Sequence, residues 1–86
     1  MLRITADTTT DGILHIRLDG HLTQADVPEL ATATEPALRG NARLVLEVSG
    51  LTYVDAQGAQ FLRGLAVRDV TIRGYSDFVA KLLGLP

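Results

Sequence analysis

The stretch from Val48 to Leu65, VSGLTYVDAQGAQFLRGL, decides how the rest of the chain is interpreted. An apolar strand end leads into a turn, and Asp55-Ala56-Gln57-Gly58 then opens an amphipathic segment. The start of a helix has free backbone N–H groups and the positive end of the helix dipole, and both attract anionic or hydrogen-bonding partners. We therefore expect the working surface of the protein at this turn, although the stretch leaves the kind of partner open.

Two strands are predicted before this stretch. Apolar and polar side chains alternate along Leu2–Asp7 and again along Ile13–Asp19, which is the period of strands with one buried face. The Asp11-Gly12 pair between them is typical of a hairpin turn, so the two strands should pair in antiparallel fashion. Their inward residues are expected to be Leu2, Ile4, Ala6, Leu14, Ile16 and Leu18.

A helix is predicted over Val27–Leu38, because apolar residues recur there at helical spacing. Asp26 and Glu29 form the expected capping box at its start, with Thr23 as a rival cap one turn earlier. Pro36 is expected to kink this helix or to end its regular part, since proline lacks a backbone N–H group.

The elements on both sides of the turn follow from the same patterns. Arg43–Val48 is a near-continuous apolar run, typical of a central strand with both faces covered, and a short run Leu51–Val54 comes after Ser49-Gly50. We expect a helix from about Gln57 to Ala66 and then a short strand over Val70–Arg73.

A last helix is predicted after Ser76, a good N-cap residue, and Gly84 is expected to end it. Apolar residues at helical spacing predict the inward faces of the last two helices. The members of these faces are Ala59, Leu62, Leu65, Ala66, Phe78, Val79, Leu82 and Leu83.

The order of these elements is strand, strand, helix, strand, helix, strand, helix. It predicts an α/β fold with a mixed four-stranded sheet, in which helices cross over between parallel strands. With 86 residues the chain has room for one domain, which we expect to span residues 1–86. A hydrophobic content of 47% with only 5% aromatic residues predicts an aliphatic core.

The composition argues against several classes of function. Eight basic and ten acidic residues give a formal charge of -2 without a basic stripe, so we expect no binding to nucleic acid. No apolar run approaches the roughly 20 residues that span a bilayer, and the N-terminal sequence does not look like a signal peptide. The absence of cysteine fits an intracellular protein. We therefore expect a cytoplasmic protein without direct membrane insertion.

Few residues are available for catalysis or metal binding. The sequence has no cysteine, no G-x-S-x-G nucleophile elbow and no phosphate-binding loop. We expect His15 and His21 to lie at the surface without a metal, since ligands at matched spacing are missing. Asp55 stands where a strand leads into a helix, which is a common position for functional groups and also the position of an N-cap. The sequence therefore predicts no enzyme activity, no metal and no cofactor.

Aromatic and amide side chains gather around the turn. Tyr53, Gln57, Gln60 and Phe61 would form the adaptable patch that protein interfaces favour, if all four were exposed together. Packing of the aromatic rings in the core is the alternative interpretation. The sequence leaves both open, because they differ only in exposure.

Residues 44–58, LVLEVSGLTYVDAQG, resemble the signature of STAS domains, in which a central strand leads through D-x-x-G into a helix. Residues 18–23, LDGHLT, resemble the family's segment after its second strand, and residues 74–79, GYSDFV, with 82–85, LLGL, resemble its closing helix. The resemblance implies the fold predicted above. The link Val67–Asp69 is shorter than in many members, so the chain looks like a short form of the family.

The resemblance implies a non-enzymatic protein-binding module of bacterial signalling, similar to anti-sigma factor antagonists. In those proteins a partner kinase phosphorylates a hydroxyl residue just before the motif glycine. That position is Gln57 here and follows Ala56, so we expect binding without this switch. An accessory subunit of a membrane lipid transport complex is the alternative that the family implies. The partner, an anti-sigma factor, a kinase or a transporter subunit, is expected to contact Asp55, Ala56, Gln57, Gly58, Gln60 and Arg63.

Overall fold

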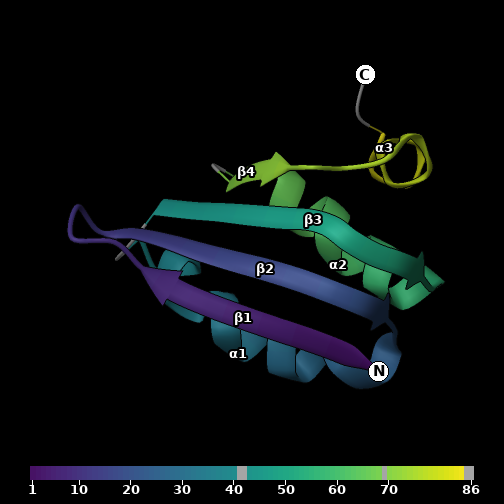
Figure 1. Cartoon of the computed structure of the whole chain (residues 1–86), viewed down its shortest axis with the longest axis horizontal. Helices are drawn as coiled ribbons and strands as arrows, with labels where there is room; N and C mark the ends of the chain where they lie inside the picture. The colour runs from purple at the N-terminus through teal and green to yellow at the C-terminus, as the bar shows by residue number, and fades with distance from the viewer. Residues whose placement is uncertain (41–42, 69, 85–86) are drawn as a thin grey trace.

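The computed structural model describes residues 1–40, 43–68 and 70–84, and Asp69 of the short link and Leu85 lie outside them. Its elements are β1 (Leu2–Thr8), β2 (Ile13–Leu22), the 3-10 helix η1 (Gln24–Asp26), α1 (Val27–Leu38), β3 (Arg43–Val54), α2 (Ala56–Ala66), β4 (Val70–Arg73) and α3 (Asp77–Leu83). The strands lie in the order β1-β2-β3-β4 (Figure 1). β1 pairs antiparallel with β2, and the other pairs are parallel. The predicted α/β fold with a mixed four-stranded sheet is therefore confirmed.

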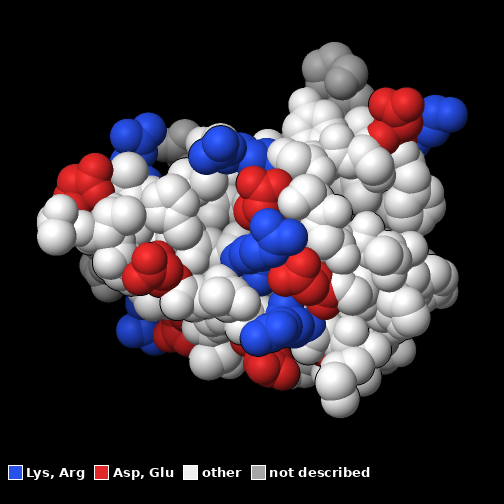
Figure 2. Space-filling model, viewed as in Figure 1, with Lys and Arg blue, Asp and Glu red and all other residues white. Residues whose placement is uncertain are grey.

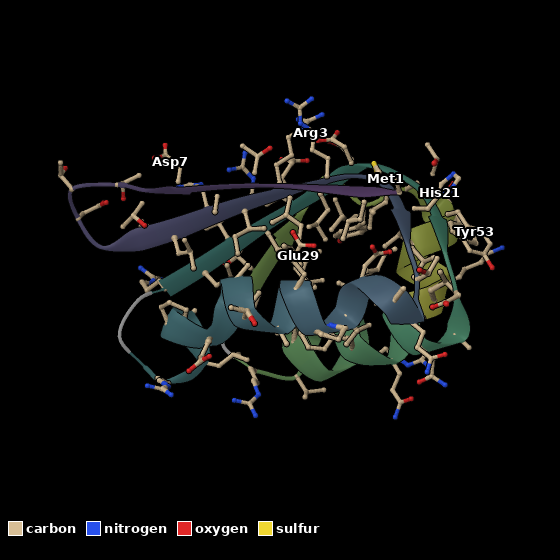
Figure 3. The ribbon with its side chains drawn as sticks, turned by 90° about the horizontal axis from the view of Figure 1, so that it is seen from below. Met1, Arg3, Asp7, His21, Glu29 and Tyr53 are labelled. Carbon is tan, nitrogen blue, oxygen red and sulfur yellow. The ribbon has the colours of Figure 1, made fainter. Side chains whose placement is uncertain are left out.

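The helices cover one face of the sheet and leave the other face open. Seen from the side, α1 and α2 lie against the same face (Figure 3). Leu44 and Leu46 point toward the helices and are buried, whereas Val45 between them is only half-buried. The prediction that the central strand is covered on both faces is therefore wrong. An apolar residue such as Val45 on the open face made the run look continuous.

β3 is one continuous strand from Arg43 to Val54, although the sequence predicted a strand over Arg43–Val48 and a separate short run over Leu51–Val54. Arg17 pairs with Glu47 while Asp19 pairs with Gly50, so β3 holds an extra residue in this interval. A second register shift follows between Gly20 and His21. Each extra residue of such a bulge changes which side chains point inward. The buried residues of β3 are accordingly Leu44, Leu46, Val48, Leu51 and Val54.

The start of α1 differs from the predicted capping box. The backbone N–H and the hydroxyl group of Thr23 both donate to Oδ2 of Asp26, at 3.0 Å each. Thr23 and Asp26 thus form the capping box of η1, one turn before α1. Asp26 is the N-cap residue of α1, as predicted, but its side chain makes no capping bond to that helix. Pro36 lies inside α1, and the helix ends two residues later at Leu38.

The caps of the last two helices are confirmed. The side chain of Asp55 accepts a hydrogen bond from the N–H of Gly58, and that of Ser76 accepts one from Val79. Gly84 follows α3 with a φ of 70°, a left-handed conformation that favours glycine. Phe78, expected in the core, has an exposed fraction of 49%. Ala6, which lies on the edge strand β1, is also exposed.

The core between sheet and helices is aliphatic, as the composition predicts. Its centre consists of side chains from β2, β3, α1 and α2 that are almost completely buried. They are Ile16, Leu18, Leu22, Leu30, Leu44, Leu46, Val48 and Leu62. The only buried polar residue among those described is Thr34, whose hydroxyl group donates to the carbonyl of Leu30.

Candidate functional site

The carboxylate of Asp55 joins the start of α2 to the end of β2. Its Oδ1 accepts from the N–H of Gly58 at 2.7 Å, and its Oδ2 accepts from the N–H of Gln24 at 2.8 Å. The N–H of Asp55 in turn donates to the carbonyl of Leu22 at 3.0 Å. The bonds from Gly58 and Gln24 hold the pKa of Asp55 below its usual value, because they favour the charged form. Both carboxylate oxygens are thus occupied within the protein.

Gly58 is buried where α2 crosses the end of β2. A Cβ at this position would lie 2.8 Å from Cγ of Leu22 and 2.9 Å from the carbonyl oxygen of Leu22. Val54 Cγ1 would be 3.2 Å away on the other side. Only glycine therefore lets the helix approach the strand this closely. In the D-x-x-G motif the Asp caps the helix, and the Gly permits its packing.

A groove lies beside this turn, between α2 and the start of α1. It has a volume of about 480 Å³. Gln57, Gln60 and Phe61 line it from α2, and Gln24, Val27 and Pro28 line it from the facing segment. Gln24, Gln57 and Gln60 are exposed, whereas Phe61 is half-buried. The groove is therefore lined by apolar groups and neutral amides, without a charged side chain.

The structure brings only part of the predicted site together. Gln57 and Gln60 line the groove, Asp55 and Gly58 shape the turn beside it, and Ala56 is exposed at the first position of α2. Arg63 is not in the groove lining. Its Nη1 donates to the carbonyl of Leu82 at 2.7 Å and so connects α2 to α3.

The aromatic residues of the turn have different surroundings. Phe61 lines the groove, so its ring joins Gln57 and Gln60 there. Tyr53 has an exposed fraction of 49%, but it lies outside the groove lining. Its ring meets that of His21 edge to face, with 5.8 Å between centroids (Figure 3). The proposed patch of four is thus partly exposed, with Tyr53 separate from the other three.

Gln24, Val27 and Pro28 were not predicted as site residues. The sequence did contain a signal for them, because β2 and β3 were expected as parallel neighbours. The carboxyl ends of such strands meet at one edge of a sheet, so the segments that follow Leu22 and Val54 must lie side by side.

Two further features bear on the kind of site. Among residues 1–40, 43–68 and 70–84, no three His, Cys, Asp or Glu side chains are grouped so that they could hold a metal ion. In the same part of the chain, every helix is too short or too polar to cross a membrane.

The fold itself defines the class of protein, an α/β domain in which a D-x-x-G turn links the central strand to the second helix. The sequence profile described as "Mlab, STAS domain" matches residues 5–85. The chain therefore belongs to the STAS domain family. No curated protein sequence matches the chain at a significant level.

Solved structures agree with this assignment at the level of the fold. The STAS domain of an anti-sigma factor antagonist from Rhodobacter sphaeroides has a TM-score of 0.68 and 24% identity, over 86% of this chain and 87% of that one. The unphosphorylated anti-sigma factor antagonist SpoIIAA has a TM-score of 0.75 and 19% identity, over 95% and 82%. An uncharacterized protein from Shewanella loihica PV-4 with a SpoIIAA-like fold has a TM-score of 0.60 and 20% identity, over 90% and 69%.

Proposed function

We propose that this STAS domain is a protein-binding module of bacterial signalling that holds its partner in the groove beside the Asp55–Gly58 turn. The single observation that carries the proposal is the groove itself, which is lined by three amide side chains and three apolar residues. Amides both donate and accept hydrogen bonds, and apolar groups provide the buried centre of protein interfaces. Two structural neighbours of the chain are described as anti-sigma factor antagonists, which supports a regulatory partner of this kind.

Binding in this groove needs no covalent modification of the turn. Ala56 and Gln57 offer no hydroxyl group for phosphorylation, and Gln57 is exposed at the groove. The partner, an anti-sigma factor or a related kinase, would therefore be bound at all times when both proteins are present. The domain acts in the cytoplasm as a single unit spanning residues 1–86, and it works by association rather than by catalysis.

A second candidate function is that of an accessory subunit in a membrane lipid transport complex. The observation that favours it is the same lack of a hydroxyl group at Ala56 and Gln57. A permanent subunit has no use for a switch, whereas a signalling protein usually needs one. The same groove would then contact a cytoplasmic subunit of the transporter.

Affinity capture from the native cell lysate tests the site and separates the two candidates. The wild-type domain is compared with a Gln57→Lys, Gln60→Lys variant, which places two charges in the neutral groove. A Thr8→Lys, Thr10→Lys variant adds the same charges to exposed positions at the β1–β2 hairpin. We expect one partner to be captured by the wild type and the hairpin variant but lost with the groove variant.

The identity of that partner, determined by mass spectrometry, distinguishes a signalling kinase or anti-sigma factor from a transporter subunit. Equal capture of the same partner by all three proteins would contradict the assignment of the groove. Far-ultraviolet circular dichroism of the groove variant provides the check that it remains folded.

A further inference from the structure

The sheet ends on one side in a long, regular edge strand. Among the described strands, β1 and β4 are the edges. β4 has four residues, whereas β1 has seven and pairs with β2 in unbroken register from Leu2 to Thr8. Edge strands are commonly protected by shortness, a bulge, a proline or a charge that points inward. β1 has neither a bulge nor a proline, and its inward positions Leu2, Ile4 and Ala6 are apolar.

Half of the backbone groups of β1 point away from the sheet. The N–H of His21 donates to the carbonyl of Met1 at 3.1 Å, and the N–H of Thr9 donates to the carbonyl of Ile13 at 2.9 Å. In an antiparallel pair, residues that bond to the neighbouring strand alternate with residues that do not. The odd-numbered residues of β1 therefore bond to β2. The N–H and C=O groups of its even-numbered residues face the outer edge.

The apolar side chains of this edge are incompletely covered. Ile4 is half-buried, whereas Leu18, its partner on β2, is completely buried. Leu2 is half-buried as well, and Ala6 is exposed. A strand on the outer side of β1 would cover these side chains, so the edge offers apolar area together with backbone groups.

α1 extends beneath the same edge. In the view onto the sheet, α1 reaches past β1 (Figure 1), and from the edge it is seen below β1 (Figure 3). Val27 and Pro28 of α1 line the groove toward α2. Helical spacing therefore places Ala33 and Ala37, both half-buried, on the opposite side of α1, below the edge. A strand added beside β1 would have these small side chains beneath it.

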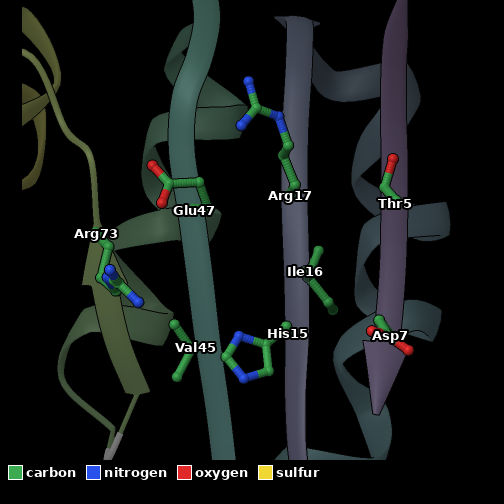
Figure 4. A pocket seen from close by; sticks show the side chains of 8 residues that line it. All are labelled: Thr5, Asp7, His15, Ile16, Arg17, Val45, Glu47 and Arg73. Carbon is green, nitrogen blue, oxygen red and sulfur yellow. The ribbon is translucent and has the colours of Figure 1, made fainter. Parts of the chain in front are cut away.

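The charges along the edge define which strand would fit. Basic and acidic groups lie over the open face of the sheet (Figure 2), and on β1 they are Arg3 and Asp7 (Figure 3). Thr5 stands between them and points to the same side as Asp7 (Figure 4). A neighbouring strand is complementary when it has an acidic residue opposite Arg3 and a basic residue opposite Asp7. On the helix side, Glu29 lies between α1 and β1 (Figure 3), which disfavours an acidic residue there.

We propose that β1 takes an extended segment of a partner protein as a fifth strand of the sheet, antiparallel to β1. Antiparallel pairing is the more stable of the two orientations per residue. The segment has a basic residue and, four positions later, an acidic residue on the open face, with apolar residues facing α1. Backbone hydrogen bonds provide the affinity, and the side chains set the register.

A second copy of the chain does not fit this edge. Pairing of two β1 edges would bring both α1 helices, which extend past β1, into the same space (Figure 1). The proposal is also independent of the groove, which lies on the other side of α1.

A capped heptapeptide of sequence TKVTVET is the probe, with its lysine opposite Asp7 and its glutamate opposite Arg3. It is titrated into the isotope-labelled domain and followed by NMR, with an expected Kd of roughly 0.1–1 mM for so small an interface. Hydrogen exchange at the amides of Ile4 and Ala6 should slow on binding. The amide of Thr5 between them should be protected already in the free domain, because it bonds to β2. Loss of this protection would mean that the peptide displaces β1 and would overturn the proposal.

Methylated peptides test the backbone pairing with a matched control. N-methylation of either valine removes an N–H group that would donate to β1, so binding should be lost. N-methylation of the central threonine removes an N–H group that points away from β1, so the Kd should stay within about twofold. Equal effects of the two methylations would contradict the added strand.

Exchanging charges tests the register. The peptide TKVTVKT places a lysine opposite Arg3 and should bind the wild type at least about threefold more weakly than TKVTVET. Arg3→Glu should reverse this preference. Arg39→Glu makes the same charge change on α1 and should keep the wild-type preference.

Absence of binding by TKVTVET, or an unchanged preference in the Arg3→Glu variant, would overturn the proposal. If circular dichroism shows that Arg3→Glu does not fold, Arg3→Gln replaces it and should reduce the preference between the two peptides.

Discussion

The Asp55–Gly58 turn and the groove beside it are built from neighbouring residues at the start of α2. Their side chains differ in what they face, either the interior of the protein or the groove. Asp55 and Gly58 face the protein, where the carboxylate accepts two backbone N–H groups and the glycine permits close packing on Leu22. Gln57 and Gln60 face the groove. Asp55 and Gly58 of the D-x-x-G motif therefore build the turn, whereas Gln57 and Gln60 leave their amides exposed at the groove.

The largest change in stability is expected from adding one methyl group at Gly58, on the side of the turn that faces the protein. Gly58→Ala should lower the free energy of unfolding by about 1–3 kcal/mol, because the new Cβ would collide with Leu22. Gly64→Ala in the same helix is the matched control. A Cβ there meets nothing within 4 Å, so the change should raise stability by about 0.5–1 kcal/mol.

Urea-induced unfolding of the two variants measures both changes. Opposite signs are expected, although each variant adds the same group to the same helix. If both substitutions stabilised the protein, the close approach of α2 to β2 would not depend on Gly58.

Removal of the cap should have the next largest effect. Asp55→Ala leaves the N–H groups of Gly58 and Gln24 without their acceptor. We expect the Tm to fall by roughly 5 °C, as measured by thermal denaturation at pH 7. Asp55→Asn keeps one acceptor oxygen and should show a smaller decrease. A Tm unchanged by both substitutions would mean that Asp55 does not hold the turn.

The lowered pKa of Asp55 predicts a smaller effect that depends on pH. A carboxyl group whose pKa is lower in the folded state stabilises the protein above its unfolded pKa, and this contribution is lost as pH falls through the folded value. For Asp55 the loss begins below the ordinary pKa of 3.8. The difference in Tm between wild type and Asp55→Asn should therefore be constant from pH 7 to about 5 and shrink below about pH 4. A difference that stays constant down to about pH 2 would contradict the lowered pKa.

The sequence predicted the elements of this fold well where periodicity and burial agree. The alternation around Leu14 and Ile16 and the helical spacing of Ala59, Leu62 and Leu65 all correspond to buried residues. It failed in β3, because a bulge changes the alternation after Val48 and makes one strand look like two separate runs in the sequence. Bulges depend on strand pairing, which a single stretch of sequence does not reveal.

The candidate site was predictable only in part, because some of its features are local and others depend on tertiary contacts. The roles of Asp55 and Ser76 follow from local hydrogen bonds at helix starts, so residue type and spacing were sufficient. The groove is a tertiary feature, formed only when Gln24 and Pro28 come to lie beside Gln57. Arg63 was expected among the partner contacts, whereas in the structure its side chain donates to the carbonyl of Leu82.

The most direct test of the account is the affinity of the purified partner for the Gln57→Lys, Gln60→Lys variant, measured by isothermal titration calorimetry. Gln57 and Gln60 are both exposed, so the Tm of the variant should stay within about 2 °C of the wild type. The Kd should rise at least about 100-fold, because two charges would be buried in a neutral interface. A Kd within about twofold of the wild-type value would contradict the proposal that the partner binds in this groove.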